Sequence, residues 1–244
     1  MKIATILPTK YLYLEEDNEY HLCLAHQLKK DSKYAKFFKD QATKGHFIIQ
    51  DNGVVECGVP LPIQELREIA ERIGCSEVVM PDSIFNYWET INLSQYAVAY
   101  MRLAMPQMKL FVVPQGSGPL EWMECVHQML KWEIDTIGIS RFVVPKLFSS
   151  RLEALKSVPM LIESDKNIHL LGCPEWPEEI AEIEAAFPGR VRGVDSGIAA
   201  IYAQDGIIMR KDAKKPERII DLDNRDINES ILERNIREWK LRAS

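Results

Sequence analysis

The stretch FIIQDNGVVE, residues 47–56, joins a short apolar run to a polar turn. The run Phe47–Gln50 is typical of a buried strand, and Asp51-Asn52-Gly53 is typical of the turn that ends one. Aspartate is common in turns because its carboxylate accepts backbone N–H groups. Asp51 therefore has two interpretations: a residue that shapes the turn, or a carboxylate placed at the end of a buried strand for chemistry.

The combination of a short apolar run and a polar turn recurs along the chain. The other predicted strands are Ile3–Leu7, Glu77–Met80, Lys109–Val113, Thr136–Ile139, Ile168–Leu171, Val191–Val194 and a weaker eighth at Gly206–Met209. Helical periodicity predicts helices at Pro62–Ile73, Asn92–Met105, Leu120–Trp132, Pro177–Ala186 and Asn228–Leu241. Strands that alternate with helices predict a parallel sheet with crossover helices. We predict an α/β fold, a (β/α)8 TIM barrel that forms a single domain over residues 1–244, with a doubly wound open sheet as the alternative.

Composition narrows the class of protein. The length of 244 residues suits one α/β barrel, and 46% hydrophobic residues suit a globular chain. A net charge of -6 argues against a general affinity for nucleic acid, although a local basic patch would suffice. No apolar run approaches the ~20 residues of a membrane span, and the first residues, MKIATILPTKYLYLEED, do not resemble a secretory signal. The five cysteines are widely spaced and form no CxxC pair, so we expect neither disulfides nor zinc, and a cytoplasmic location.

One cluster of possible metal ligands, His21, Cys23 and His26, lies in YHLCLAHQL. A structural zinc site needs four ligands, and no second cluster supplies the remainder. We therefore predict a partly buried helix at this place and no metal.

Polar or glycine-bearing segments close nearly every predicted strand: LPTK, QDNG, MPDS, VPQGSG, GIS, LLGCPE and GVDSG. In a barrel these segments meet at the C-terminal mouth, where barrel enzymes have their active sites. Asp51, Asp82 and Asp195 would converge there with Gln115. For any one aspartate alone a role in a turn or helix cap is favoured, but three at strand ends favour a site in which crowding raises the pKa of one carboxyl group.

Five of these segments, in this order, resemble the tRNA-guanine transglycosylase superfamily. DNGVVE (51–56) is similar to the family's Asp-Ser-Gly-Gly-Phe-Gln, and VPQG (113–116) to its Val-Gln-Gly-Gly, with Pro114 as a departure. The strand segment at 137–139 resembles a glycine-bearing strand of the family. The segment at 170–175 resembles its Met-Gly-Val-Gly-x-Pro-Glu turn, and 193–195 its late Gly-Ile-Asp.

The resemblance implies a base exchange in which guanine in a nucleic acid is replaced by a 7-deazaguanine, with no cofactor. It implies that Asp195 attacks C1′ to form a covalent glycosyl-enzyme and that Asp51 is the general acid/base. Asp82 would read the guanine edge, Gln115 would face its carbonyl, and Gly138 would offer backbone contacts. The remaining predicted base-binding positions are Asn52, Glu56 and Gly116.

The chain departs from the family pattern at three places. Glu56 stands where the family has glutamine, and Ile198 where it has a second late aspartate. The family's C-terminal zinc site is absent, because no cysteine follows Cys173 and no histidine follows His169. The 7-deazaguanine DNA transglycosylases, relatives that modify DNA, thus become the closer comparison, and DNA is favoured over tRNA.

A basic segment after the last predicted strand would contact phosphates. Its predicted nucleic-acid-binding residues are Arg210, Lys211, Lys214 and Lys215. A solvated basic loop is an equally favoured interpretation.

The sequence does not decide whether the protein is a monomer or a homodimer. It also leaves two other functions open. One is a nucleosidase-like barrel enzyme that acts on a free small molecule. The other is a catalytically idle barrel that binds nucleic acid or a protein.

Overall fold

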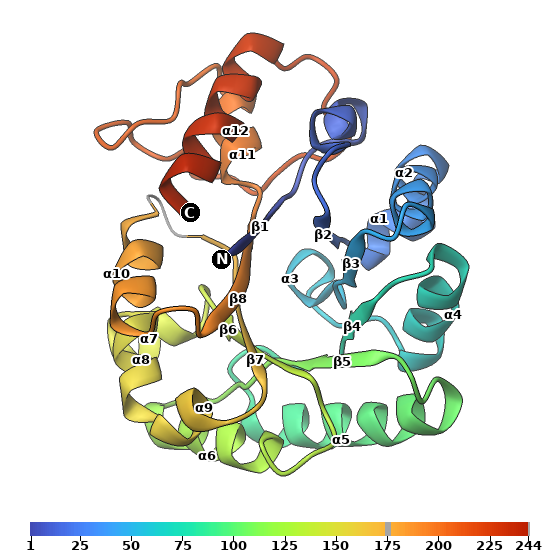
Figure 1. Cartoon of the computed structure of the whole chain (residues 1–244), viewed down its shortest axis with the longest axis vertical. Helices are drawn as coiled ribbons and strands as arrows, with labels where there is room; N and C mark the ends of the chain where they lie inside the picture. The colour runs from blue at the N-terminus through green and yellow to red at the C-terminus, as the bar shows by residue number, and fades with distance from the viewer. Residues whose placement is uncertain (174–176, 244) are drawn as a thin grey trace.

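The chain folds as a (β/α)8 TIM barrel in a computed structural model that describes residues 1–173 and 177–243 (Figure 1). The strands are β1 (Lys2–Thr5), β2 (Tyr20–Cys23), β3 (Phe47–Gln50), β4 (Glu77–Val79), β5 (Lys109–Val112), β6 (Thr136–Ser140), β7 (Asn167–Leu171) and β8 (Val191–Ser196). Every strand pair is parallel, so all strand ends point toward the same mouth.

Helices connect the strands and surround the barrel in Figure 1. They are the 3-10 helix η1 (Thr9–Glu15) and the α-helices α1 (Ala25–Lys30), α2 (Ser32–Thr43), α3 (Val54–Cys57), α4 (Ile63–Ile73), α5 (Tyr87–Ala104), α6 (Pro119–Met129), α7 (Val144–Phe148), α8 (Arg151–Ser157), α9 (Pro159–Glu163), α10 (Glu178–Ala186), α11 (Ile198–Gln204) and α12 (Glu229–Ala243). The five predicted helices correspond to α4, α5, α6, α10 and α12. The helix α5 begins five residues earlier than predicted, because the side chain of Asn86 caps it by accepting from Glu89 N at 3.1 Å.

The barrel is nearly closed. The hydrogen-bonded order is β1-β8-β7-β6-β5-β4-β3-β2, which leaves β1 and β2 as the two edges of the ladder. Beside this seam, Asn18 Nδ2 donates to Ile3 O at 3.0 Å. Ile220 and Leu222, from the segment before α12, pack with the apolar side chains of the barrel interior. Apolar packing and a side-chain hydrogen bond thus hold the two edges where the ladder ends.

The eighth strand is β2, so the helix predicted at YHLCLAHQL is wrong for Tyr20–Cys23 and begins only at Ala25. Tyr20 and Leu22 belong to the interior cluster, whereas Cys23 belongs to the outer core beneath the helices. His21 lies against aromatic rings of α2, with its ring centroid 5.9 Å from that of Phe38. Both faces of β2 are buried, so its residues show no alternation of apolar and polar character.

The predicted strand Gly206–Met209 is also wrong, because this segment is a loop. The buried side chain of Asn235 on α12 takes the place of a neighbouring strand there. Its Nδ2 donates to Ile207 O at 2.9 Å, and its Oδ1 accepts from Met209 N at 2.7 Å. The backbone groups of the loop are therefore satisfied without a sheet.

A buried ion pair occupies the floor of the barrel. Arg192 on β8 donates to both carboxylate oxygens of Glu77 on β4, at 3.0 and 2.5 Å, and Thr136 Oγ1 donates to the same group at 2.5 Å. Gly193 makes room beside this pair, since a Cβ there would lie 2.8 Å from ring atoms of Tyr20. Strands on opposite sides of the barrel are thus joined through its interior.

We predict that Glu77→Ala lowers the free energy of unfolding by about 3–5 kcal/mol, because it leaves Arg192 in the barrel floor without its carboxylate. Urea denaturation at neutral pH measures the loss. The matched control is Glu71→Ala, which breaks an exposed pair with Arg67 on α4 and should cost less than about 1 kcal/mol. Equal losses in the two variants would contradict this account of the floor.

Candidate active site at the barrel mouth

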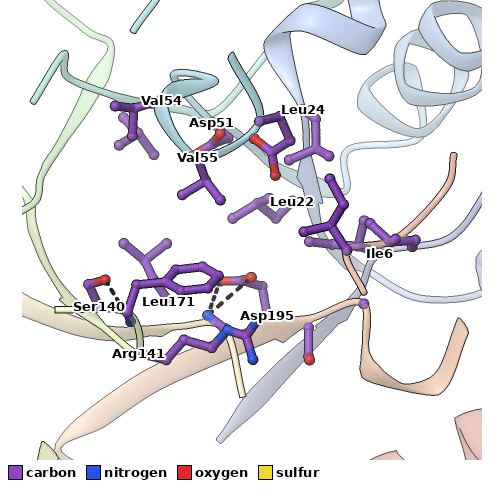
Figure 2. A pocket seen from close by; sticks show the side chains of 18 of the residues that line it. Ile6, Leu22, Leu24, Asp51, Val54, Val55, Ser140, Arg141, Leu171 and Asp195 are labelled. Atoms are coloured by element: carbon purple, nitrogen blue, oxygen red, sulfur yellow. Dashed lines mark hydrogen bonds between the residues drawn. The ribbon is translucent and has the colours of Figure 1, made fainter. Parts of the chain in front are cut away.

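One pocket at the C-terminal mouth gathers the polar residues that follow the strands. Asp51 follows β3, Asp82 follows β4 and Gln115 follows β5, while Asp195 lies within β8. Figure 2 shows Asp51 and Asp195 on facing walls of this pocket, with apolar side chains such as Leu22 and Val55 between and around them. The arrangement follows from the parallel strands, because each carries its last residues to the same rim.

Asp51 and Asn52 shape the turn after β3 and also face the pocket. Asp51 Oδ2 accepts from Gly53 N at 2.8 Å, and Asn52 Oδ1 accepts from Val54 N at 2.9 Å. Gly53 has φ of 81°, a left-handed conformation that glycine adopts without strain. The two interpretations of Asp51 are therefore compatible: the turn fixes the carboxylate at the pocket wall.

Asp82 is almost fully buried, with 1% of its surface exposed. Its two oxygens accept from Asn52 Nδ2 at 2.6 Å and from Gln115 Nε2 at 2.5 Å. Asn52 is held in turn by Met80 O at 2.9 Å, and Gln115 Oε1 accepts from Phe85 N at 3.2 Å. Two amide side chains from neighbouring strand ends thus fix the orientation of one carboxyl group.

Asp195 has a different set of partners. Its Oδ1 lies 3.0 Å from His169 Nε2, a ring that is fully buried on β7. The backbone N–H of Gly172 lies 3.3 Å from each carboxylate oxygen. The β7 side of the pocket therefore orients this carboxylate, and dashed lines mark hydrogen bonds of Asp195 in Figure 2.

The pocket raises the pKa of three of its acids. Desolvation is the largest cause in each case: it raises the pKa of Asp51 to about 6, and those of Asp82 and Glu56 to about 7. The charge of Asp195 adds to the rise at Asp51, whereas the hydrogen bonds from Asn52 and Gln115 oppose the rise at Asp82. Glu56 lies on α3 at the rim of the pocket. Among the nearby charges, that of Asp51 contributes most to the rise in the pKa of Glu56.

Arg141, directly after β6, adds a positive charge to the wall that carries Asp195. Its Nη1 donates to Cys173 O at 2.7 Å, and its guanidinium stacks on the ring of Phe142, 4.3 Å from the centroid. Gly172 leaves the room that the Arg141 side chain occupies, since a Cβ at Gly172 would lie 2.5 Å from Arg141 Cδ. Burial lowers the pKa of Arg141, and the charge of Asp195 opposes that change.

The two predicted base-contacting glycines lie outside the lining of this pocket. A Cβ at Gly138 would lie 2.4 Å from the ring of Phe111, so this glycine is needed for packing within the barrel. A Cβ at Gly116 would lie 2.6 Å from Trp122 N, so this glycine lets the loop approach α6. Both have a structural reason for being glycine that is independent of any ligand.

The basic segment contributes one residue to the pocket, Lys215. Three others are exposed and paired with acids: Arg210 with Asp212 at 3.1 Å, Lys214 with Glu217 at 3.3 Å, and Lys211 with Glu178. Pro174 and Glu175, which carry part of the family resemblance, lie outside the described residues.

Sequence reasoning missed His169, Tyr20 and Arg141. His169 is the only polar residue in the run Ile168–Leu171, and a polar side chain inside a buried strand is a signal that could have been used. Arg141 follows the segment GIS, so its place at a strand end was also visible. Tyr20 could not be placed because β2 was not predicted.

In the described part of the chain, no group of three or more His, Cys, Asp or Glu side chains is arranged to hold a metal ion. No helix within residues 1–173 and 177–243 has the length and apolar character to cross a bilayer. No protein-family model matches the chain, and a comparison with curated proteins finds no match.

We predict that Asp195→Asn lowers the pKa of Asp51 from its value of about 6, because the substitution removes the negative charge that disfavours ionisation of Asp51. Carbon-13 NMR titration of the labelled aspartate carboxyls measures the change. Asp205→Asn is the control, since Asp205 is paired with Arg218 at the surface, outside the pocket. An unchanged midpoint in Asp195→Asn would show that the two carboxyls do not interact.

Proposed function

We propose that the protein is a base-exchange transglycosylase, a pentosyltransferase that replaces guanine in a nucleic acid with a 7-deazaguanine through a covalent aspartyl-glycosyl intermediate. The observation that carries the proposal is the contrast between Asp195 and Asp51 within one pocket. The family resemblance supplies the substrate class.

The two carboxyl groups suit different halves of such a reaction. Asp195 Oδ1 lies 3.0 Å from His169 Nε2 and 3.3 Å from the backbone N–H of Gly172, and these two contacts orient the carboxylate. Asp51 has a pKa of about 6, so it can release and accept a proton near neutral pH. Asp195 is therefore the nucleophile and Asp51 the general acid/base.

The exchange balances with these two groups alone. A bond forms between an Asp195 oxygen and C1′ while the C1′–N9 bond breaks; its electron pair leaves with guanine, and Asp51 supplies the proton. The incoming 7-deazaguanine then gives its N9 proton to Asp51, attacks C1′ and releases Asp195. A covalent intermediate divides one difficult displacement into two easier steps.

Asp82 is suited to reading the guanine edge. An ionised carboxylate can accept from both the ring N–H and the exocyclic amine of guanine, a donor pair that adenine lacks. Gln115 Nε2 uses one hydrogen on Asp82 and has a second that a base carbonyl can accept. Asn52 holds Asp82 from the other side, so all three side chains serve one recognition surface.

We favour DNA over tRNA as the polymer, because residues 174–244 contain no cysteine or histidine for the zinc site that the tRNA enzymes have. The target base must leave its stack to reach the pocket, at a cost of about a few kcal/mol. Apolar walls that include Val54 and Leu171 would pack on the faces of the base and offset part of that cost. Lys215, at the same pocket, would lie near the flanking phosphates.

The test is to incubate the protein with labelled guanine and either duplex DNA, single-stranded DNA or tRNA, and to measure label in the polymer. Incorporation into DNA supports the proposal as stated, and incorporation into tRNA alone overturns the DNA preference. Cleavage of free nucleosides without any polymer requirement would instead support a nucleosidase. Binding of polymer with no exchange of guanine or a 7-deazaguanine would support an idle barrel.

We predict that Asp195→Asn lowers the exchange rate by about 10³-fold or more, because an amide cannot act as the nucleophile. A protein–nucleic acid adduct that survives denaturation should form with the wild type and not with this variant. Asp205→Asn, at the surface, should exchange at the wild-type rate. An active Asp195→Asn variant would assign the attack to another residue.

We predict that Asp82→Asn reduces the preference for guanine over hypoxanthine, which lacks the exocyclic amine. The loss should reach about tenfold in kcat/KM, the size of one hydrogen bond to a charged group. Competition between the two labelled bases measures this preference. If the ratio stays at its wild-type value, Asp82 does not read the amine.

A further inference from the structure

A continuous line of side chains runs through the barrel interior from its floor to the pocket. Arg192, which is paired with Glu77, also places Nε 3.2 Å from the hydroxyl of Tyr20. That hydroxyl lies 2.9 Å from His169 Nδ1, and His169 Nε2 lies 3.0 Å from Asp195 Oδ1. The line joins β4, β8, β2 and β7 to the proposed nucleophile.

The direction of each hydrogen bond follows from the chemistry of the donors. Arg192 Nε can only donate, so the oxygen of Tyr20 accepts from it. Burial raises the pKa of Tyr20, which keeps the phenol protonated, and its single hydrogen is then directed to His169 Nδ1. His169 Nδ1 is therefore an acceptor. The ring hydrogen is on Nε2, which donates to Asp195.

The surroundings hold the imidazole in this orientation. His169 is 0% exposed and Tyr20 is 3% exposed. The ring of Phe111 meets His169 edge-on at 5.5 Å between centroids, and Phe47 stacks on Tyr20 at 5.6 Å. A rotated imidazole would lose both polar partners inside an apolar cluster, at a cost of about 1–3 kcal/mol for each unsatisfied group.

Ionisable groups reach His169 from three strands. Tyr20 on β2 contacts Nδ1, Asp195 on β8 contacts Nε2, and Arg192 with its partner Glu77 lies one residue further, beyond Tyr20. A second proton on the imidazole would place an N–H on Nδ1 against a hydroxyl that already accepts from Arg192. The Tyr20 hydroxyl would then lie between two donors, Arg192 Nε and His169 Nδ1, and neither could accept its hydrogen.

We propose that Tyr20, fixed by Arg192, holds His169 as the Nε2–H tautomer, and that His169 in this form orients the Asp195 carboxylate for attack. The role in attack rests on the proposed function; the tautomer does not. His169 is then a positioning residue. It does not protonate the leaving base, so this proton comes from Asp51.

The tautomer is tested without any assay of activity. Nitrogen-15 NMR of the full chain with labelled histidine, at neutral pH, should show His169 as Nε2–H. In Tyr20→Phe, which removes only the hydroxyl, His169 should populate the Nδ1–H tautomer. A doubly protonated or Nδ1–H His169 in the wild type, or an unchanged spectrum in Tyr20→Phe, would overturn the proposal.

The positioning role is tested by kinetics on the same variants. Tyr20→Phe should lower kcat by up to about 100-fold, the cost of a misplaced reacting group, with little change in KM for the base. His169→Gln keeps a donor for Asp195 and should retain more activity than His169→Phe. His127→Phe, on α6 outside the pocket, is the control.

Two outcomes separate this inference from the proposed function. Wild-type kcat in His169→Phe and in Tyr20→Phe, or equal activity in His169→Gln and His169→Phe, would overturn the positioning role. Failure of the wild type to exchange bases on any polymer would overturn the proposed function and the role in attack, while the NMR result would still decide the tautomer.

Discussion

The common direction of the eight strands is the constraint on which the rest of this molecule depends. Because every pair is parallel, the residues that follow β3, β4 and β5 reach the same rim as Asp195 of β8. Each of those carboxyl groups alone would be an ordinary turn residue. Together, in a pocket with apolar walls, they are desolvated; burial is the main cause that raises the pKa of Asp51 and of Asp82, and a nearby carboxylate adds to each rise.

The three aspartates differ in the hydrogen-bond partners that surround each carboxyl group. Asp195 receives N–H groups from His169 and Gly172, whereas Asp51 receives chiefly the N–H of its own turn at Gly53. Asp82 accepts from two amide side chains, which gives it a fixed orientation. The same residue type therefore occurs in three different environments, which the local backbone and the neighbouring side chains determine.

The sequence predicted the parallel barrel and the convergence of Asp51, Asp82 and Asp195, because strand ends carry a local pattern. It did not predict β2, since a four-residue strand with both faces buried has no periodicity that distinguishes it from a helix. It predicted a weaker strand at Gly206–Met209, and only the distant Asn235 explains why that segment is a loop. Long-range partners such as that between Tyr20 and His169 cannot be read from neighbours in the chain.

The floor of this barrel has a consequence for anyone who redesigns it. The Glu77–Arg192 pair is an obvious target for replacement by well-packed apolar residues, an exchange that often leaves a protein equally or more stable. Here Arg192 also contacts Tyr20, and Tyr20 contacts His169. Replacing the pair to increase heat resistance would thus remove the donor that fixes the Tyr20 hydroxyl, and the phenol hydrogen would be free to rotate. Substitutions on β4 and β8 made for stability would therefore also change the contact between Tyr20 and His169.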